Sequence, residues 1–167
     1  MDLYQAILQR HSVRSFSDKP VEKEKLDRVL DVVAQAPTAV NFQAFKVFVI
    51  PTKGKKDMLQ RIYRKDWFSD APYVLLVCMQ IDKCWVRRDG KSYSDVDGAI
   101  IMDHIILAAT AEGLGTCWVG AFDEAAAIKL LGLPEGLEPL VFTPLGYEQD
   151  TAPKRSRKKT EELVVYL

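Results

Sequence analysis

Two arginines flank a histidine and a hydroxyl near the N-terminus, in the run Arg10-His11-Ser12-Val13-Arg14. An arginine guanidinium presents a rigid fork of N–H donors that matches phosphate oxygens or the acceptor edge of a planar ring. An exposed charged turn has the same composition, because arginine is common at protein surfaces. The run therefore indicates either an anion site or a solvated turn.

A second polar group lies between an expected helix and an expected strand, in the segment Ala36-Pro37-Thr38-Ala39-Val40-Asn41-Phe42-Gln43. Asn41 and Gln43 each offer a donor and an acceptor, which suits hydrogen bonding to the edge of a heterocycle. Pro, Thr and Asn are also ordinary turn residues. This segment is thus a candidate binding loop or simply a turn.

The third group is the run Gly113-Leu114-Gly115-Thr116-Cys117-Trp118-Val119-Gly120-Ala121-Phe122. It is not a dinucleotide fingerprint, since a third glycine would be needed where Trp118 stands and the motif should open a helix. Gly120 inside an apparent strand suggests close approach of a backbone or a ligand, or else a bulge. Cys117 in this apolar run is more typical of packing than of a nucleophile.

Five cations cluster in the C-terminal segment 154–159, which is either a solvated run or an anion site. Nucleic-acid binding through this tail is a weaker alternative, because the chain carries 23 basic and 23 acidic residues and no stacking motif accompanies the cluster.

Composition further limits the kind of protein that this sequence can encode. The chain has 167 residues, of which 48% are hydrophobic, so we expect one globular domain over residues 1–167. The N-terminus shows no signal-peptide pattern and no apolar run is long enough for a membrane span. Three cysteines without CxxC spacing and only two histidines predict reduced thiols, no metal site and a cytoplasmic location.

The spacing of hydrophobic residues predicts which helices and strands hold these groups of residues. We expect helices near residues 3–10, between Pro20 and Pro37, around 58–62, over 97–112 and from Asp123 to Gly132. Apolar runs predict strands at 45–50, 73–79, 116–122 and 140–142, and a strand-like end at 163–167. The alternation indicates an α/β or α+β fold in layers. The terminal segment has no local strand to pair with, so we expect it to dock on a second subunit.

Together the four groups resemble the FMN-dependent nitroreductase family over nearly the whole chain. The family motifs R-x-S-x-R, P-[ST]-x-x-N-x-Q and G-L-G-T-C-W-x-G-x-F occur here in order, followed by a basic tail before E-E-L-V. Ala44 and Phe45 replace a frequent Pro-Trp pair. The resemblance implies an α+β fold, a three-layer α-β-α sandwich in an intertwined homodimer, with FMN at the interface and the tail from about residue 153 to 167 reaching the partner.

The resemblance also implies roles for individual residues. Arg10, Arg155 and Arg157 would hold the FMN phosphate, and Ser12 and Arg14 would face the pyrimidine side of the ring. Asn41 and Gln43, from the partner, would bond the ring or ribityl chain. The Gly120 backbone would approach N5. The full implied cofactor-binding set is Arg10, His11, Ser12, Arg14, Pro37, Thr38, Asn41, Gln43, Trp118, Val119, Gly120, Arg155 and Arg157.

The resemblance implies that the protein is an FMN-dependent NAD(P)H oxidoreductase. In such an enzyme NADH or NADPH passes hydride to N5 of FMN and leaves, and an electron-poor acceptor then binds where the nicotinamide was. Nitroaromatics, quinones and activated alkenes are such acceptors. The flavin performs the chemistry, so the resemblance names no catalytic side chain. The alternative is the same fold with dehalogenating or other flavin chemistry, or with no turnover. Aromatic residues at 63–68 and Trp85 could wall the open flavin face or belong to the core.

Overall fold

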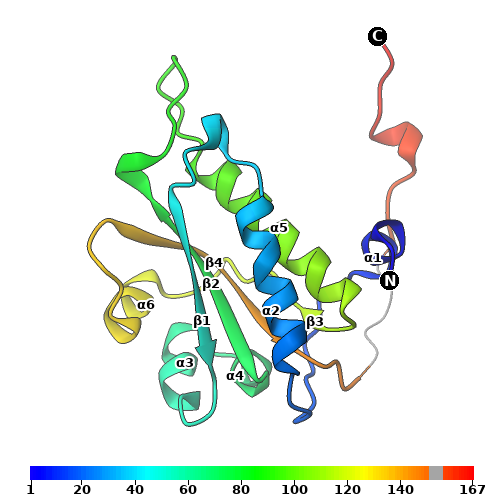
Figure 1. Ribbon diagram of the computed structural model, residues 1–167, viewed down its shortest axis with the longest axis vertical. Coiled ribbons are helices and arrows are strands. Elements are labelled where there is room, and N and C mark those ends of the chain that lie inside the picture. Colours follow the sequence, from blue (N-terminus) through cyan, green and yellow to red (C-terminus); the bar gives the residue numbers. More distant parts are fainter. Residues whose placement is uncertain (151–155) are drawn as a thin grey trace.

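The computed structural model describes residues 1–150 and 156–167. Its centre is an antiparallel four-stranded sheet in the order β1-β2-β4-β3 (Figure 1). The central strand β2 is the continuous apolar run expected at 73–79, and it is buried on both faces. The strands are β1 (Phe45–Pro51), β2 (Tyr73–Gln80), β3 (Gly115–Thr116) and β4 (Leu137–Gly146).

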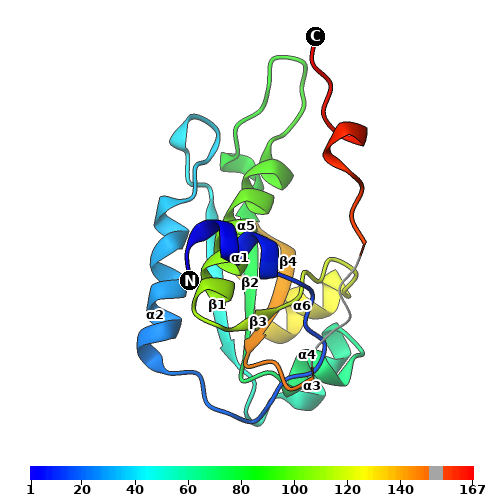
Figure 2. The same cartoon turned by 90° about the vertical axis from the view of Figure 1, so that its right-hand side faces the viewer.

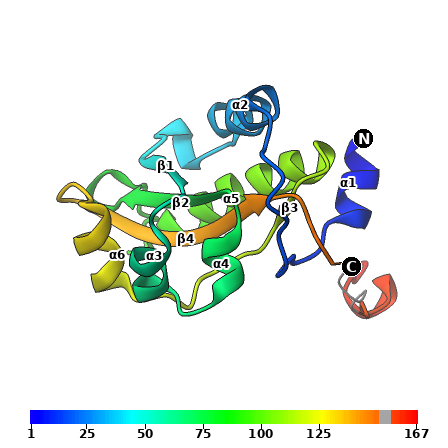
Figure 3. The ribbon, with the colours of Figure 1, turned by 90° about the horizontal axis from the view of Figure 1, so that it is seen from below.

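Helices cover both faces of the sheet, which confirms the α+β three-layer sandwich (Figures 1 and 3). On one face lie α2 (Lys23–Asp31) and α5 (Ser94–Ala111), and α1 (Leu3–Gln9) contacts α5. The other face carries α3 (Lys56–Ile62), α4 (Asp66–Asp70) and α6 (Glu124–Leu131). Short 3₁₀ turns complete the list: Val32–Gln35, Ala39–Asn41, Ile81–Lys83 and Thr160–Glu162.

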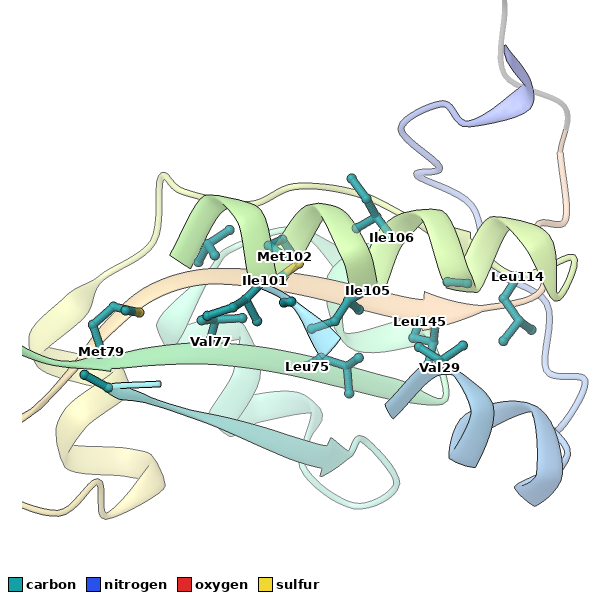
Figure 4. Packing of buried hydrophobic residues seen from close by; sticks show 14 of the residues in the cluster. Val29, Leu75, Val77, Met79, Ile101, Met102, Ile105, Ile106, Leu114 and Leu145 are labelled. Atoms are coloured by element: carbon teal, nitrogen blue, oxygen red, sulfur yellow. The ribbon is translucent and has the colours of Figure 1, made fainter. Parts of the chain in front are cut away.

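The core between α5 and the sheet fixes the direction of α5. Leu75 and Val77 of β2 face Ile101 and Ile105 of α5, and all four side chains are fully buried (Figure 4). The long apolar helix expected at the centre of the fold is therefore confirmed, although it begins at Ser94 rather than at Asp97. Burial of such side chains contributes about 1.5–3 kcal/mol each, so this packing holds α5 against the sheet.

The strand expected at 116–122 is wrong beyond its start. β3 contains Gly115 and Thr116 alone, and Val119 then exchanges both backbone hydrogen bonds with Phe142 at 2.9 and 3.0 Å. In this register Cys117 would stand opposite Pro144, which has no N–H to donate. The Cys117 N–H instead donates to the Thr143 hydroxyl at 3.1 Å, so the ladder is interrupted at this residue.

The C-terminal segment projects from the body of the chain (Figures 1 and 2). The strand-like end expected at 163–167 makes no strand within this chain, and Tyr166 is 95% exposed. Its apolar residues therefore have no cover from their own subunit. In the part of the chain that the structure describes, no helix combines the length and apolar character needed to cross a membrane, and no His/Cys/Asp/Glu group could hold a metal ion.

Candidate functional site

The N-terminal motif packs against the start of the third motif. Ser12 forms a parallel bridge with Thr116, and the Val13 N–H donates to the Thr116 carbonyl at 2.8 Å. Gly115 permits this approach, because a Cβ at that position would lie 2.8 Å from Val13 Cγ2. The structure thus brings residues 10–14 and 115–117 together, although they lie about a hundred positions apart in sequence.

Gly120 has a different environment from the one its apparent strand suggested. A Cβ there would meet only Trp118 Nε1, at 3.8 Å, so no backbone of this chain approaches closely and no bulge occurs there. Trp118 beside it is 44% exposed, whereas Val119 is buried against the sheet. The backbone at Gly120 is therefore open to a molecule from outside the chain.

Cations gather around this junction. Arg14 lies over Trp67 of α4, with Cζ 5.8 Å from the ring centroid, and Arg10 closes α1. Burial raises the pKa of the Cys117 thiol, an effect that Arg14, the Ser12 hydroxyl and Arg10 oppose without overcoming. A buried thiol with a raised pKa is a poor nucleophile near neutral pH, so Cys117 is a packing residue as its apolar run suggested.

His11 is held between two acceptors. Its Nδ1 lies 2.9 Å from the Gln9 carbonyl and its Nε2 lies 2.8 Å from Glu148 Oε1. A neutral imidazole has one N–H, so an imidazolium satisfies both contacts with an ionised carboxylate. The Gln9 carbonyl and Glu148 accordingly raise the pKa of His11, against burial and Arg10. Both ring nitrogens thus bind the protein itself.

This geometry predicts a pH dependence of stability. Because the folded-state pKa of His11 is raised, its stabilising contribution is complete below its ordinary pKa of 6.5 and is lost as pH rises through the folded value. The melting temperature of the wild-type protein should therefore fall relative to H11Q between about pH 6 and about pH 9. A constant difference between the two proteins across that range would show that the ring does not titrate against Glu148.

The second motif forms a strained loop. Three residues without the freedom of glycine have positive φ: Val40 at 47°, Asn41 at 57° and Gln43 at 50°. A left-handed conformation costs an L-residue roughly 1–2 kcal/mol, and a β-branched valine tolerates it worst. Strain of this kind persists only where the surroundings enforce it, which is common at functional sites.

Two polar side chains hold the loop in place. Thr38 Oγ1 accepts from the Gln43 N–H at 3.0 Å, and Asp97 Oδ1 of α5 accepts from the Ala39 N–H at 2.9 Å. Asp97 is only 2% exposed, so this bond forms out of water. Pro37, Asn41 and Gln43 remain exposed, and the two amides are available to a ligand.

The two motifs lie at opposite ends of α5 (Figure 1). Asp97 in its first turn holds the 38–43 loop, while Gly115, shortly after its last turn, contacts Val13 of the N-terminal motif. An 18-residue helix at 1.5 Å per residue is about 27 Å long. One chain therefore does not bring Asn41 and Gln43 to the residues at 10–14.

The tail residues are placed only in part. Arg155 lies outside the described residues. Arg157 is exposed and its Nη1 donates to the Ser156 carbonyl at 3.4 Å. Convergence of Arg155 and Arg157 on Arg10 thus stays a prediction.

Sequence reasoning missed two residues that shape the site: Asp97 and Glu148. Asp97 carried a signal, because it is a carboxylate directly before the apolar stretch of the helix. Of the aromatic residues at 63–68, Phe68 belongs to the core, since it packs edge-on with Tyr63 at 5.4 Å and with Phe142 at 5.7 Å, whereas Trp67 lies beside Arg14 of the N-terminal motif.

Comparisons with known proteins place this arrangement in a family. A family model described as "Putative TM nitroreductase" matches residues 2–167. A nitroreductase family protein from Clostridium difficile is 35% identical, with a TM-score of 0.88 over 99% of this chain and 98% of that one. One from Clostridium novyi is 31% identical, with a TM-score of 0.81 over 90% and 87% of the two chains.

Among characterised relatives, the FMN reductase (NAD(P)H) of Bacillus subtilis is 27% identical over 96% of this chain and 71% of its own length. Since the family model spans nearly every residue and the solved structures share the fold at substantial identity, the chain belongs to the nitroreductase family of oxidoreductases.

Proposed function

We propose that the protein is an FMN-dependent NAD(P)H oxidoreductase that works as a homodimer, with each flavin held by both subunits. The separation of the two motifs along α5 carries this proposal. Residues 10–14 and 118–120 form one half of a flavin site, and the strained 38–43 loop, which is held at the other end of the helix of about 27 Å from residues 10–14, forms the other half. A two-fold dimer can form two complete flavin sites, because the loop of each subunit then meets the N-terminal motif of its partner.

Exposed apolar side chains support the dimer. On α1, Leu3, Tyr4 and Leu8 are 62%, 78% and 82% exposed. In the tail, Leu163 and Tyr166 are 65% and 95% exposed. Clusters of this kind on a globular chain mark an interaction surface. A partner subunit of the same sequence offers matching apolar surface, and the tail is long enough to lie across it.

The residues present fit FMN by their chemistry. Arg10, with Arg155 and Arg157 of the tail, would bind its phosphate, while Ser12 and Arg14 would face the pyrimidine edge. Asn41 and Gln43 from the partner would pair with the ring or ribityl chain through amides that the loop holds outward. Gly120 leaves space for the ring to approach the backbone N–H, since no Cβ stands there.

FMN, when bound, supplies hydride transfer between NAD(P)H and an electron-poor acceptor such as a nitroaromatic, a quinone or an activated alkene. The protein orients the ring and places positive charge near its pyrimidine edge, where Arg14 is fixed over Trp67. The cysteines take no part, since burial raises the pKa of Cys78 to about 12 and also raises that of Cys117.

The visible spectrum of the protein, reconstituted with FMN, tests this function. We expect flavin absorption that bleaches under anaerobic addition of NADH or NADPH and recovers when a quinone is added. A protein that takes up no FMN would overturn the proposal. Reduction without reoxidation by quinone or nitroaromatic would favour the alternative, in which the same fold performs dehalogenation, other flavin chemistry or no turnover.

A further inference from the structure

A β-hairpin over residues 85–93 projects beyond the N-terminal end of α5 (Figures 1 and 2). Its sequence, Trp85-Val86-Arg87-Arg88-Asp89-Gly90-Lys91-Ser92-Tyr93, has three basic residues and one acidic residue. A projecting segment of this composition is usually solvated and irregular. This one is ordered by its own contacts, which suggests that it presents particular side chains.

The base and the arms of the hairpin are fixed. Trp85 and Tyr93 pack edge-on with centroids 4.8 Å apart, and the Tyr93 N–H donates to the Trp85 carbonyl at 3.0 Å. Val86 bridges Ser92, and the Arg87 N–H donates to the Lys91 carbonyl at 2.9 Å. Three residues of extended chain, 85–87, place the turn at 88–90 about 10 Å from the base.

The charges divide into a paired set and a free set. Arg87 binds Asp89 through Nε at 2.9 Å and lies 5.9 Å from the Tyr93 ring centroid, so its charge is neutralised within the hairpin. Arg88 and Lys91 are exposed and form no ion pair among residues 1–150 and 156–167. The hairpin therefore presents two unneutralised cations on a rigid arm, as an anion site requires.

The hairpin is joined to the flavin-facing loop of the proposed site. The Asp97 N–H donates to the Tyr93 carbonyl at 2.9 Å, and Asp97 Oδ1 accepts from Ala39 of the loop. On its other side, the Cys84 thiol contacts the Ala44 carbonyl at 3.9 Å. Where Asn41 and Gln43 reach the partner's flavin, this arm consequently stands beside the same flavin.

We propose that Arg88 and Lys91 bind the phosphate groups of the pyridine dinucleotide that reduces the flavin in the partner subunit. The inference rests on the proposed function. A dinucleotide that stacks its nicotinamide on the flavin must extend its phosphates away from the ring, and the arm offers cations displaced from the flavin-facing loop. Arginine and lysine are both effective phosphate ligands. Trp85, which the sequence left as either a flavin wall or a core residue, packs against Tyr93 at the base of this arm.

The test compares R88Q/K91Q with the wild-type holoenzyme by anaerobic stopped-flow reduction. We expect the Kd for NADH and NADPH to rise about tenfold or more, with the limiting rate of flavin reduction unchanged. An equal loss for both donors identifies the pyrophosphate as the group bound, and a larger loss for NADPH identifies the 2′-phosphate. A reduced nicotinamide without phosphates should react equally with both proteins. The salt dependence of the donor Kd should also weaken in the variant.

Two controls separate the possible failures. K53Q/K55Q removes two exposed cations from the turn beyond the far end of β1, and it should leave the donor Kd unchanged. FMN affinity, measured by fluorescence quenching on apoprotein, should be the same in all three proteins. A fall in FMN affinity in R88Q/K91Q would show that the arm binds the flavin phosphate, and an unchanged donor Kd would overturn the inference. A wild-type protein that binds no FMN would instead overturn the proposed function.

Discussion

Replacing Leu8 with glutamate is expected to split the proposed dimer and, with it, to abolish FMN binding. Leu8 is 82% exposed on α1, next to Tyr4 at 78% and Ile7 at 51%. Exposure of these apolar side chains to water is unfavourable, so we expect this face of α1 to be buried in the dimer. Glutamate at this position would place a charge inside that contact.

Symmetry doubles the effect. In a two-fold dimer each substitution occurs twice, and each loses about 1.5–3 kcal/mol of leucine burial before the cost of desolvating the carboxylate is added. The sum of about 3–6 kcal/mol corresponds to a rise of two to four orders of magnitude in the dimer Kd, at 1.4 kcal/mol for each factor of about ten. Each isolated subunit would retain only half of each flavin site.

Sedimentation velocity at micromolar concentration, with FMN titration of the same samples, measures both effects. The matched control is I128E, because Ile128 is an exposed apolar residue, 38% accessible, in the second half of another helix, α6. I128E should remain dimeric and bind FMN. A dimeric L8E protein with full FMN affinity would show that α1 lies outside the interface and that one chain suffices for binding.

The sequence could predict elements whose limits are set locally. Asp123 caps α6 by accepting from the Ala126 N–H at 2.8 Å, and Gly132 ends that helix at φ 62°, as their residue types indicated. Strand β2 follows from an apolar run alone. These features depend on neighbours a few positions away, which the sequence displays directly.

Features set by distant partners could not be predicted in this way. The third strand ends early because Pro144, on another strand, cannot donate to it. Asp97 looked like a helix boundary, yet it holds a loop 58 positions away in the chain. The spacing of the motifs indicated which residues act together, whereas only the structure shows that α5 keeps them apart. That separation is the physical reason to expect a second subunit.

Alanine substitutions at Gly115 and Gly120 are expected to have large but different effects on stability and on FMN affinity. In G115A the new Cβ would lie 2.8 Å from Val13 Cγ2 and 3.1 Å from Val13 Cβ. Val13 is buried and β-branched, so it cannot rotate away, and the N-terminal motif must shift. Overpacking of this kind costs about 1–3 kcal/mol, which exceeds the small gain from a less flexible unfolded chain. We expect G115A to lose stability and also FMN affinity, because Ser12 and Arg14 flank the displaced residue.

In G120A the nearest atom to the new Cβ is 3.8 Å away, so the apoprotein should be at least as stable to denaturant as the wild type. FMN affinity should nevertheless fall, since the methyl group would occupy the space through which the ring approaches the backbone. Urea unfolding of both apoproteins, followed by FMN titration, separates the two positions. If G115A unfolds like the wild type, Val13 yields more easily than its burial implies. If G120A binds FMN normally, the flavin does not lie against residue 120, and the open surface there must serve another contact.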